Sequence, residues 1–126
     1  MSPTQRTLAE LRGLGRRCGI VERFNPYGGP HGVRQDLFGF IDIICIDPVK
    51  GIVAIQSCGT DWSGHVHKLL EERHEEVADW LQFNPIELWA WRRVKKKRGG
   101  RQMIYRPRIG DLVFDNGNIK VVERKI

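Results

Sequence analysis

A carboxylate, Asp42, and an amide, Gln56, lie within the apolar runs of the stretch at residues 34–58 (RQDLFGFIDIICIDPVKGIVAIQSC). The stretch predicts two buried strands joined by a turn at residues 47–51, because aromatic and β-branched residues occupy both faces of each strand. A carboxylate without a partner inside a core strand costs several kcal/mol. We therefore expect a cation or a hydrogen-bond donor to compensate the charge of Asp42.

The chemistry open to these residues is the binding of a hard divalent cation, Mg²⁺ or Mn²⁺. Carboxylate and amide oxygens suit Mg²⁺, which keeps several of its waters. The predicted ligands are Asp42, the Gln56 side chain and the Ser57 carbonyl. Asp36 is a further candidate, because it shares the strand parity of Asp42. The alternative is structural: a hydrogen-bonded aspartate and an amide that satisfies a neighbouring loop.

The elements that would position these residues follow an α-β-β-β-α-β order in a single domain of residues 1–126. Thr7 and Glu10 match a capping box that starts a first helix, and the apolar residues within 66–81 recur at helical spacing. Strands are expected at residues 18–24, 37–46, 52–57 and 86–94. The fold class is therefore α/β, with a mixed four-stranded central sheet flanked by helices.

Residues 95–126 predict a small, basic C-terminal β-hairpin extension. The run KKKRGGR at 95–101 is expected to form a hairpin tip. Asp115-Asn116-Gly117-Asn118 is a strong turn signal. Short strands are expected at residues 103–108, 112–114 and 119–122.

Charge and cysteine content indicate the kind of partner and compartment. The formal net charge of +6 favours an acidic partner, of which nucleic acid fits best. The three cysteines, Cys18, Cys45 and Cys58, form no CxxC motif, which is typical of a reducing, intracellular compartment. The sequence contains no signal-peptide pattern and no apolar run of membrane-spanning length, so no membrane partner is expected. No organic cofactor is expected either.

The order of these motifs resembles the PD-(D/E)XK nuclease superfamily, most closely its compact, Holliday-junction-resolvase-like and phage-type members. Asp42, in the sequence GFID, matches the aspartate of the second strand. Gln56-Ser57-Cys58 matches the third motif as a Q-x-C variant, and Glu10 matches the carboxylate of the first helix. The resemblance covers residues 7–94, the nuclease-like core.

One departure from the family pattern concerns the catalytic lysine. Cys58 stands at its position, and a neutral thiol cannot stabilise charge on a phosphate. In some relatives the lysine has moved to the following helix, where Lys68 is the candidate in this sequence. Lys50 is a poorer candidate, because it belongs to a turn.

The resemblance implies a Mg²⁺-dependent endodeoxyribonuclease that hydrolyses phosphodiester bonds in branched or structured DNA. Its residues would be Asp42, Gln56, Lys68 and Glu10, and the enzyme would be a cytoplasmic homodimer in a bacterial or phage-infected cell. A catalytically inactive, nuclease-derived nucleic-acid-binding module is the main alternative. A regulatory interaction protein with a coincidental likeness is the third hypothesis.

Several basic residues are predicted to contact DNA. Arg34 either touches the scissile phosphate or pairs with Asp36. The cations of the hairpin tip would follow a phosphate backbone: Lys95, Lys96, Lys97, Arg98 and Arg101.

Other conspicuous residues are expected to have structural roles. Glu22 is expected to be solvated or ion-paired. Trp89 and Trp91 are predicted to belong to the core.

Overall fold

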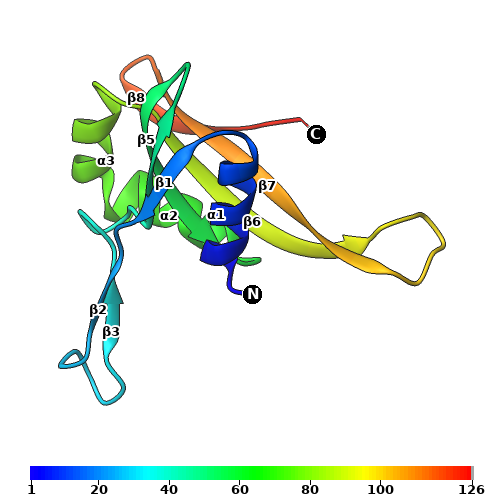
Figure 1. Ribbon diagram of the computed structural model, residues 1–126. Helices are drawn as coiled ribbons and strands as arrows, with labels where there is room; N and C mark the ends of the chain where they lie inside the picture. Colours follow the sequence, from blue (N-terminus) through cyan, green and yellow to red (C-terminus); the bar gives the residue numbers. More distant parts are fainter. Residues whose placement is uncertain (126) are drawn as a thin grey trace.

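The computed structural model describes residues 1–125 and contains a six-stranded mixed sheet (Figure 1). The strand order is β1-β4-β5-β6-β7-β8. Only β5 and β6 run parallel, and every other neighbouring pair is antiparallel. The strands are β1 (Arg17–Ile20), β4 (Ile43–Asp47), β5 (Gly51–Cys58), β6 (Ile86–Lys95), β7 (Met103–Asp115) and β8 (Asn118–Glu123).

The predicted α/β class is confirmed, but the predicted count of four strands in the sheet is wrong. The residues expected to form a separate extension continue the same sheet, because β7 pairs with β6 from Lys95↔Met103 to Glu87↔Asp111. β7 is one continuous strand of 13 residues rather than two short ones. The turn at Asn116 and Gly117 is confirmed, with φ of 52° and 83°.

Helices cover both faces of the sheet, as the doubly apolar strands predict. On one face α1 (Pro3–Gly13) packs through Leu8 and Leu11 against β4, β5 and both tryptophans of β6. On the other face lie α2 (Trp62–His67), a π-helical turn η1 (Lys68–Glu72) and α3 (His74–Leu81). Trp89 and Trp91 are 1% and 7% exposed, so their predicted core role is confirmed.

The segment before β4 is a turn, where the sequence predicts a strand. Phe38 and Gly39 have φ of 53° and 80°, and the Leu37 amide donates to the Ile41 carbonyl. The turn lets Phe40 and Ile41 enter the core while Phe38 stays 60% exposed. The two carboxylates of Asp36 and Asp42 do lie close together, but the turn brings them there and not the strand parity from which this was predicted.

The predicted first strand is also divided in two. It breaks at Val21 and Glu22, whose amides both donate to the Asp42 carbonyl, at 2.9 and 3.4 Å. Beyond the break, β2 (Arg23–Asn25) pairs with β3 (Val33–Gln35) in a separate two-stranded sheet. Figure 1 shows this hairpin, the β2–β3 arm, projecting from the body of the molecule.

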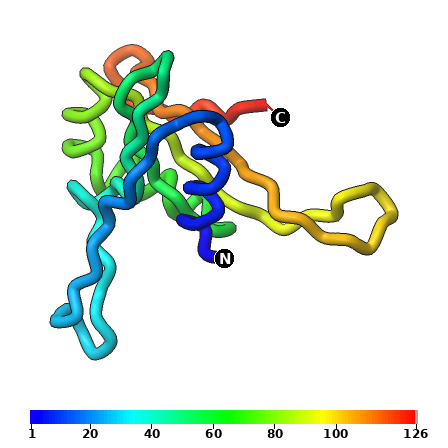
Figure 2. The backbone as a smooth tube through the Cα atoms, viewed as in Figure 1, coloured from blue at the N-terminus to red at the C-terminus, as the bar shows by residue number. Residues whose placement is uncertain are grey.

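A second hairpin, formed by the ends of β6 and β7, projects in another direction (Figure 2). Its tip contains the predicted basic run, and the Lys96 amide donates to the Gln102 carbonyl at 2.9 Å. The tip is thus confirmed as a hairpin, which we call the β6–β7 arm. All of its predicted DNA-contacting cations are exposed: Lys95, Lys96, Lys97, Arg98 and Arg101.

Helix boundaries differ from the predicted ones for local reasons. Ser2 is the N-cap of α1, since its hydroxyl accepts from the Gln5 amide and Pro3 occupies the first turn. The capping box of Thr7 and Glu10 is therefore wrong. Asp61 caps α2 through the Gly64 amide. Within residues 1–125, no helix has the length and apolar character needed to cross a membrane.

A buried ion network ties the ends of several strands together. Glu87 on β6 is fully buried and accepts from Arg16 (2.8 and 3.0 Å), Lys50 (2.9 Å) and Arg124 (2.9 Å). The Trp89 indole also donates to it at 2.9 Å. These contacts join the chain before β1, the β4–β5 turn, β6 and the chain after β8, so the network fixes the frame that carries the site.

Candidate metal centre

Asp42 lies immediately before β4, and its side chain is buried. Its Oδ2 atom accepts from Gln56 Nε2 at 2.6 Å and from the Ser57 amide at 2.7 Å. Its own amide donates to the Ile55 carbonyl at 2.9 Å, which holds it beside β5. The sequence prediction that Asp42 and Gln56 meet across neighbouring strands is confirmed. No arginine is among the side-chain donors to Asp42 within residues 1–125.

Three carboxylates come together at this point. Glu22, Asp36 and Asp42 each offer an oxygen, and these oxygens lie within 4.8 Å of one another. Each carboxylate comes from a junction: the break between β1 and β2, the end of β3, and the start of β4. We call Glu22, Asp36 and Asp42 the acidic cluster.

The cluster carries an unusual protonation pattern. Burial, followed by a hydrogen bond with Asp36, raises the pKa of Asp42 to about 8. Burial also opposes ionisation of Asp36, but hydrogen bonds from Asp42 and Lys68 outweigh it and lower the pKa of Asp36. The pair therefore retains one shared proton at neutral pH in the absence of a cation, as expected for two carboxyl groups in close contact.

The Gln56 amide meets the cluster through its nitrogen, which donates to Asp42, and its oxygen is left without a donor within residues 1–125. Gln56 is 2% exposed, and its Oε1 atom is buried without a hydrogen-bond partner among the described residues. A buried amide oxygen without a donor costs free energy. Carboxylate and amide oxygens are also the donor set that Mg²⁺ and Mn²⁺ prefer. The residues present thus fit a hard divalent cation.

Lys68 reaches the cluster from the helical segment that connects β5 and β6. Its Nζ atom lies 2.9 Å from Asp36 Oδ2, and its side chain is 26% exposed. Lys68 is the first residue of the π-helical turn, a rare irregularity that is frequent at functional sites. The predicted candidate for the displaced lysine is therefore placed beside the carboxylates.

Cys58 cannot replace that lysine by charge. Burial is the main reason that the pKa of its thiol is raised to about 12. The thiol is therefore neutral, and its Sγ atom lies 3.9 Å from the Asp61 carbonyl. Lys50, the poorer candidate, points to the Glu87 network instead.

Glu10, a predicted site residue, lies away from the cluster. It is exposed on α1 and is not one of the clustered carboxylates, because the face of α1 that meets the sheet carries Thr4, Thr7, Leu8 and Leu11. The third carboxylate of the cluster is Glu22 instead of Glu10. Glu22 was expected to be solvated or ion-paired, because a glutamate in an apparent strand ordinarily is, and it does pair with Arg34.

Ser57 contacts Asp42 through its backbone amide, whereas its carbonyl was the predicted metal ligand. Its hydroxyl lies 2.7 Å from the Thr7 hydroxyl, which in turn accepts from the Trp91 indole at 2.8 Å. This buried chain of hydrogen bonds joins α1, β5 and β6 behind the cluster. It was not foreseen from the sequence, where Thr7 resembled a helix cap.

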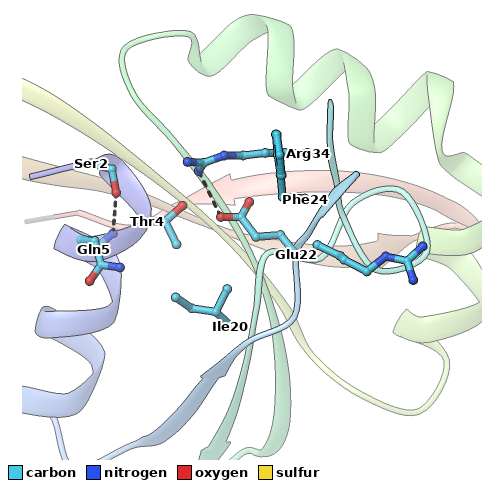
Figure 3. Close-up of a pocket in the computed structure, with 8 residues that line it drawn as sticks. Ser2, Thr4, Gln5, Ile20, Glu22, Phe24 and Arg34 are labelled. Carbon is cyan, nitrogen blue, oxygen red and sulfur yellow. Dashed lines mark hydrogen bonds and ion pairs between the residues drawn. The ribbon is translucent and has the colours of Figure 1, made fainter. Parts of the chain in front are cut away.

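The cluster opens to solvent on two sides. A pocket of about 330 Å³ is lined by Glu22, Phe24 and Arg34, together with residues of α1 (Figure 3). A second pocket, of about 480 Å³, is lined by Asp36, Lys68 and again Arg34. Arg34 borders both pockets and pairs with Glu22 at 3.4 Å, so the predicted pairing with Asp36 is wrong. Glu22 thus lines one pocket and Asp36 lines the other.

Searches of protein-family models, of curated proteins and of solved structures find no match for this chain. Its relation to the PD-(D/E)XK superfamily therefore stays a prediction, and the function must be argued from the geometry of the acidic cluster.

Proposed function

We propose that the protein is a metal-dependent endonuclease that hydrolyses phosphodiester bonds in DNA. The observation that carries this proposal is the acidic cluster with its added groups: three carboxylates within 4.8 Å, a buried Gln56 oxygen without a partner, and a lysine ammonium 2.9 Å from Asp36. Hydrolysis of a phosphodiester uses these groups together.

The cation, Mg²⁺ or Mn²⁺, would be held by Asp42, Asp36 and Glu22. The Gln56 side chain would join them once its amide turns to present the oxygen in place of the nitrogen that now faces Asp42. When bound, it would polarise a phosphoryl oxygen and lower the pKa of an attacking water. Binding would displace the proton that Asp42 shares with Asp36, because a carboxylate must be ionised to act as a ligand.

Two basic side chains would act on the phosphate. The Lys68 ammonium lines the larger pocket beside Asp36, where it can donate to a phosphoryl oxygen as negative charge develops. Arg34 has a side chain that is 69% exposed, so it is free to exchange its long contact with Glu22 for a phosphate. These roles require no covalent intermediate.

DNA as the substrate is supported by the exposed cations of the β6–β7 arm. Each phosphate neutralised by a lysine or arginine releases counterions and adds affinity that falls with salt concentration. Branched or structured DNA, a homodimer and a cytoplasmic setting in bacterial or phage-infected cells belong to this proposal as expectations. Size-exclusion chromatography with light scattering would test the dimer.

The decisive experiment uses linear, supercoiled, single-stranded and four-way-junction DNA with Mg²⁺, Mn²⁺ or EDTA. We expect cutting with either metal and none with EDTA. Asp42→Asn should lower the rate by at least about 100-fold, because it removes the buried ligand charge. The matched control is Asp115→Asn, an exposed carboxylate at the end of β7. Metal-independent cutting, or full activity in Asp42→Asn, would refute the proposal.

A second candidate is a nuclease-derived module that binds DNA without cutting it. The observation that favours it is the neutral, buried Cys58 thiol where the family has a lysine. Retained DNA binding with no cutting in either metal, on any of the four substrates, would select this candidate.

A further inference from the structure

The wall of the smaller pocket contains an aromatic ring that the proposed chemistry does not use. Phe24 lies on β2 and is 57% exposed, although it is two residues from Glu22 of the acidic cluster. We propose that the Phe24 ring stacks on an unpaired base next to the phosphate bound at the cluster. The preferred substrate would then be DNA that is single-stranded or carries an unpaired nucleotide at the cut. This inference rests on the proposed function.

The Phe24 ring is held in place despite its exposure. It packs against Gly32, where the backbone has φ of +81° and an added Cβ would collide with the ring atoms Cζ and Cε2. Phe24 is also the cross-strand partner of Arg34, and Figure 3 shows the ring next to the Arg34 side chain. A fixed aromatic face loses little conformational entropy when a flat ligand stacks on it.

The surroundings of the ring suit a nucleotide. Arg23 and Arg34 line the same pocket as Phe24, so the site combines two cations with one aromatic face. This combination of basic groove and stacking platform is typical of proteins that bind single strands. The volume of about 330 Å³ falls in the range of small-ligand pockets.

The position of Arg34 indicates the path of the strand. Since Arg34 borders both pockets, a phosphate beside it would lie between the Lys68 side of the cluster and the Phe24 side. The neighbouring nucleotide would then reach the smaller pocket. Bases inside a duplex are already stacked on each other and cannot lie against Phe24 unless they leave the helix. The ring therefore selects for an unpaired nucleotide.

The test uses oligonucleotides in which the fluorescent base 2-aminopurine is unpaired, either in a single strand or at a one-nucleotide bulge. Binding is measured with Ca²⁺ in place of Mg²⁺, so that the readout does not depend on cutting. We expect wild-type protein to quench the fluorescence. Phe24→Ala should abolish the quenching and weaken single-strand binding by about tenfold, the loss typical of one stacked base. Binding to a fully paired duplex should stay unchanged.

Two further variants separate stacking from a general loss of structure. Phe24→Trp keeps an aromatic face and should retain quenching and affinity. Phe83→Ala removes a phenylalanine that is 81% exposed outside this pocket, and it should behave as wild type. Unchanged quenching in Phe24→Ala would overturn the inference, as would an equal loss of single-strand and duplex binding.

Cutting of the same oligonucleotides with Mg²⁺ reports separately on the proposed function. Cutting that does not discriminate between paired and unpaired DNA would overturn the stacking inference and leave the nuclease standing. Phe24-dependent quenching without any cutting would refute the nuclease and support the stacking contact.

Discussion

Asp42 is the residue on which the site depends. Its burial and its contact with Asp36 make ionisation unfavourable until a positive charge is present. A side chain kept at such a cost is typical of a functional position. The same group therefore links the stability of the metal-free protein to pH and to divalent cations.

We predict that Asp42→Asn stabilises the metal-free protein at alkaline pH. The pKa of Asp42 is raised from 3.8 to about 8, so the wild type loses stability as pH rises through that interval. The variant lacks this buried charge and should be more stable by about 1–3 kcal/mol at pH values near 9. Near pH 4 the two proteins should differ much less. Urea unfolding with EDTA at both pH values measures the difference.

The same variant should lose its response to metal. Mg²⁺ or Mn²⁺ should raise the unfolding temperature of the wild type and of Asp115→Asn, but not that of Asp42→Asn. Calorimetry in buffers of different ionisation enthalpy should show proton release on metal binding near neutral pH. A wild type that gains no stability from either metal contradicts the assignment of the cluster.

At the scale of elements, the irregular segments form the site and the regular ones support it. Glu22 follows a broken strand, Asp36 precedes the turn at Phe38 and Gly39, and Lys68 begins a π-helical turn. Regular strands and helices bury their apolar side chains in the two cores. The polar groups of the site come from the junctions between these elements. The π-helical turn is the irregular element with the clearest test.

We predict that Lys68→Met removes cutting without removing metal binding. The ammonium stabilises charge on the phosphate, so its loss should slow cutting by roughly 100- to 1000-fold. Metal-induced stabilisation should persist, because Lys68 is not a ligand. Lys68→Arg should restore part of the rate. Lys120→Met, which removes an exposed lysine paired with Asp115, is the matched control. Equal rates in Lys68→Met and the control would remove Lys68 from the mechanism.

On the scale of the whole molecule, two arms project from a sheet that helices cover on both faces (Figure 1). The β2–β3 arm begins at the acidic cluster. The β6–β7 arm carries a run of exposed cations at its tip, at residues 95–101. This arrangement separates general affinity for a phosphate backbone from contacts near the scissile bond. The two contributions should respond differently to salt.

We predict that Lys96→Ala combined with Lys97→Ala weakens DNA binding with little effect on stability. The slope of log affinity against log salt should become shallower by about 1–2, because up to two phosphate contacts are lost. Titrations at several salt concentrations measure the slope. The control removes two exposed cations outside the β6–β7 arm, Lys120→Ala with Lys125→Ala, and should keep the wild-type slope. An identical slope in both double variants would exclude the arm from the DNA interface.

The Glu87 network should determine acid stability. Despite burial, hydrogen bonds from Arg16, Trp89 and Lys50 hold the pKa of Glu87 well below its usual value of 4.5. Its contribution is therefore complete above that value and is lost as pH falls below it. Glu87→Gln should cost about 3–5 kcal/mol at pH 7, because it leaves buried Arg16 partly uncompensated. Urea unfolding of the variant at pH 7 and at pH 3 would show a difference that shrinks with acid; a constant difference contradicts this account.

Much of the fold followed from short-range pattern. Doubly apolar strands require cover on both faces, so the α/β class and the helices on either side could be predicted from the central hairpin. Alternation placed Trp89 and Trp91 in the core, and Asn-Gly chemistry located the last turn. A carboxylate and an amide in facing strands also made the meeting of Asp42 with Gln56 foreseeable.

Only the tertiary structure decided which other residues join them. Glu22, rather than Glu10, completes the cluster, because a strand breaks where two of its amides turn to the Asp42 carbonyl. Lys68 reaches Asp36 across 32 positions of sequence through an irregular helical turn. Such placements depend on packing between segments that are distant in the sequence, and a local sequence pattern does not report that packing. The sequence alone thus determined the layers of the molecule, whereas three-dimensional packing decided the composition of the site.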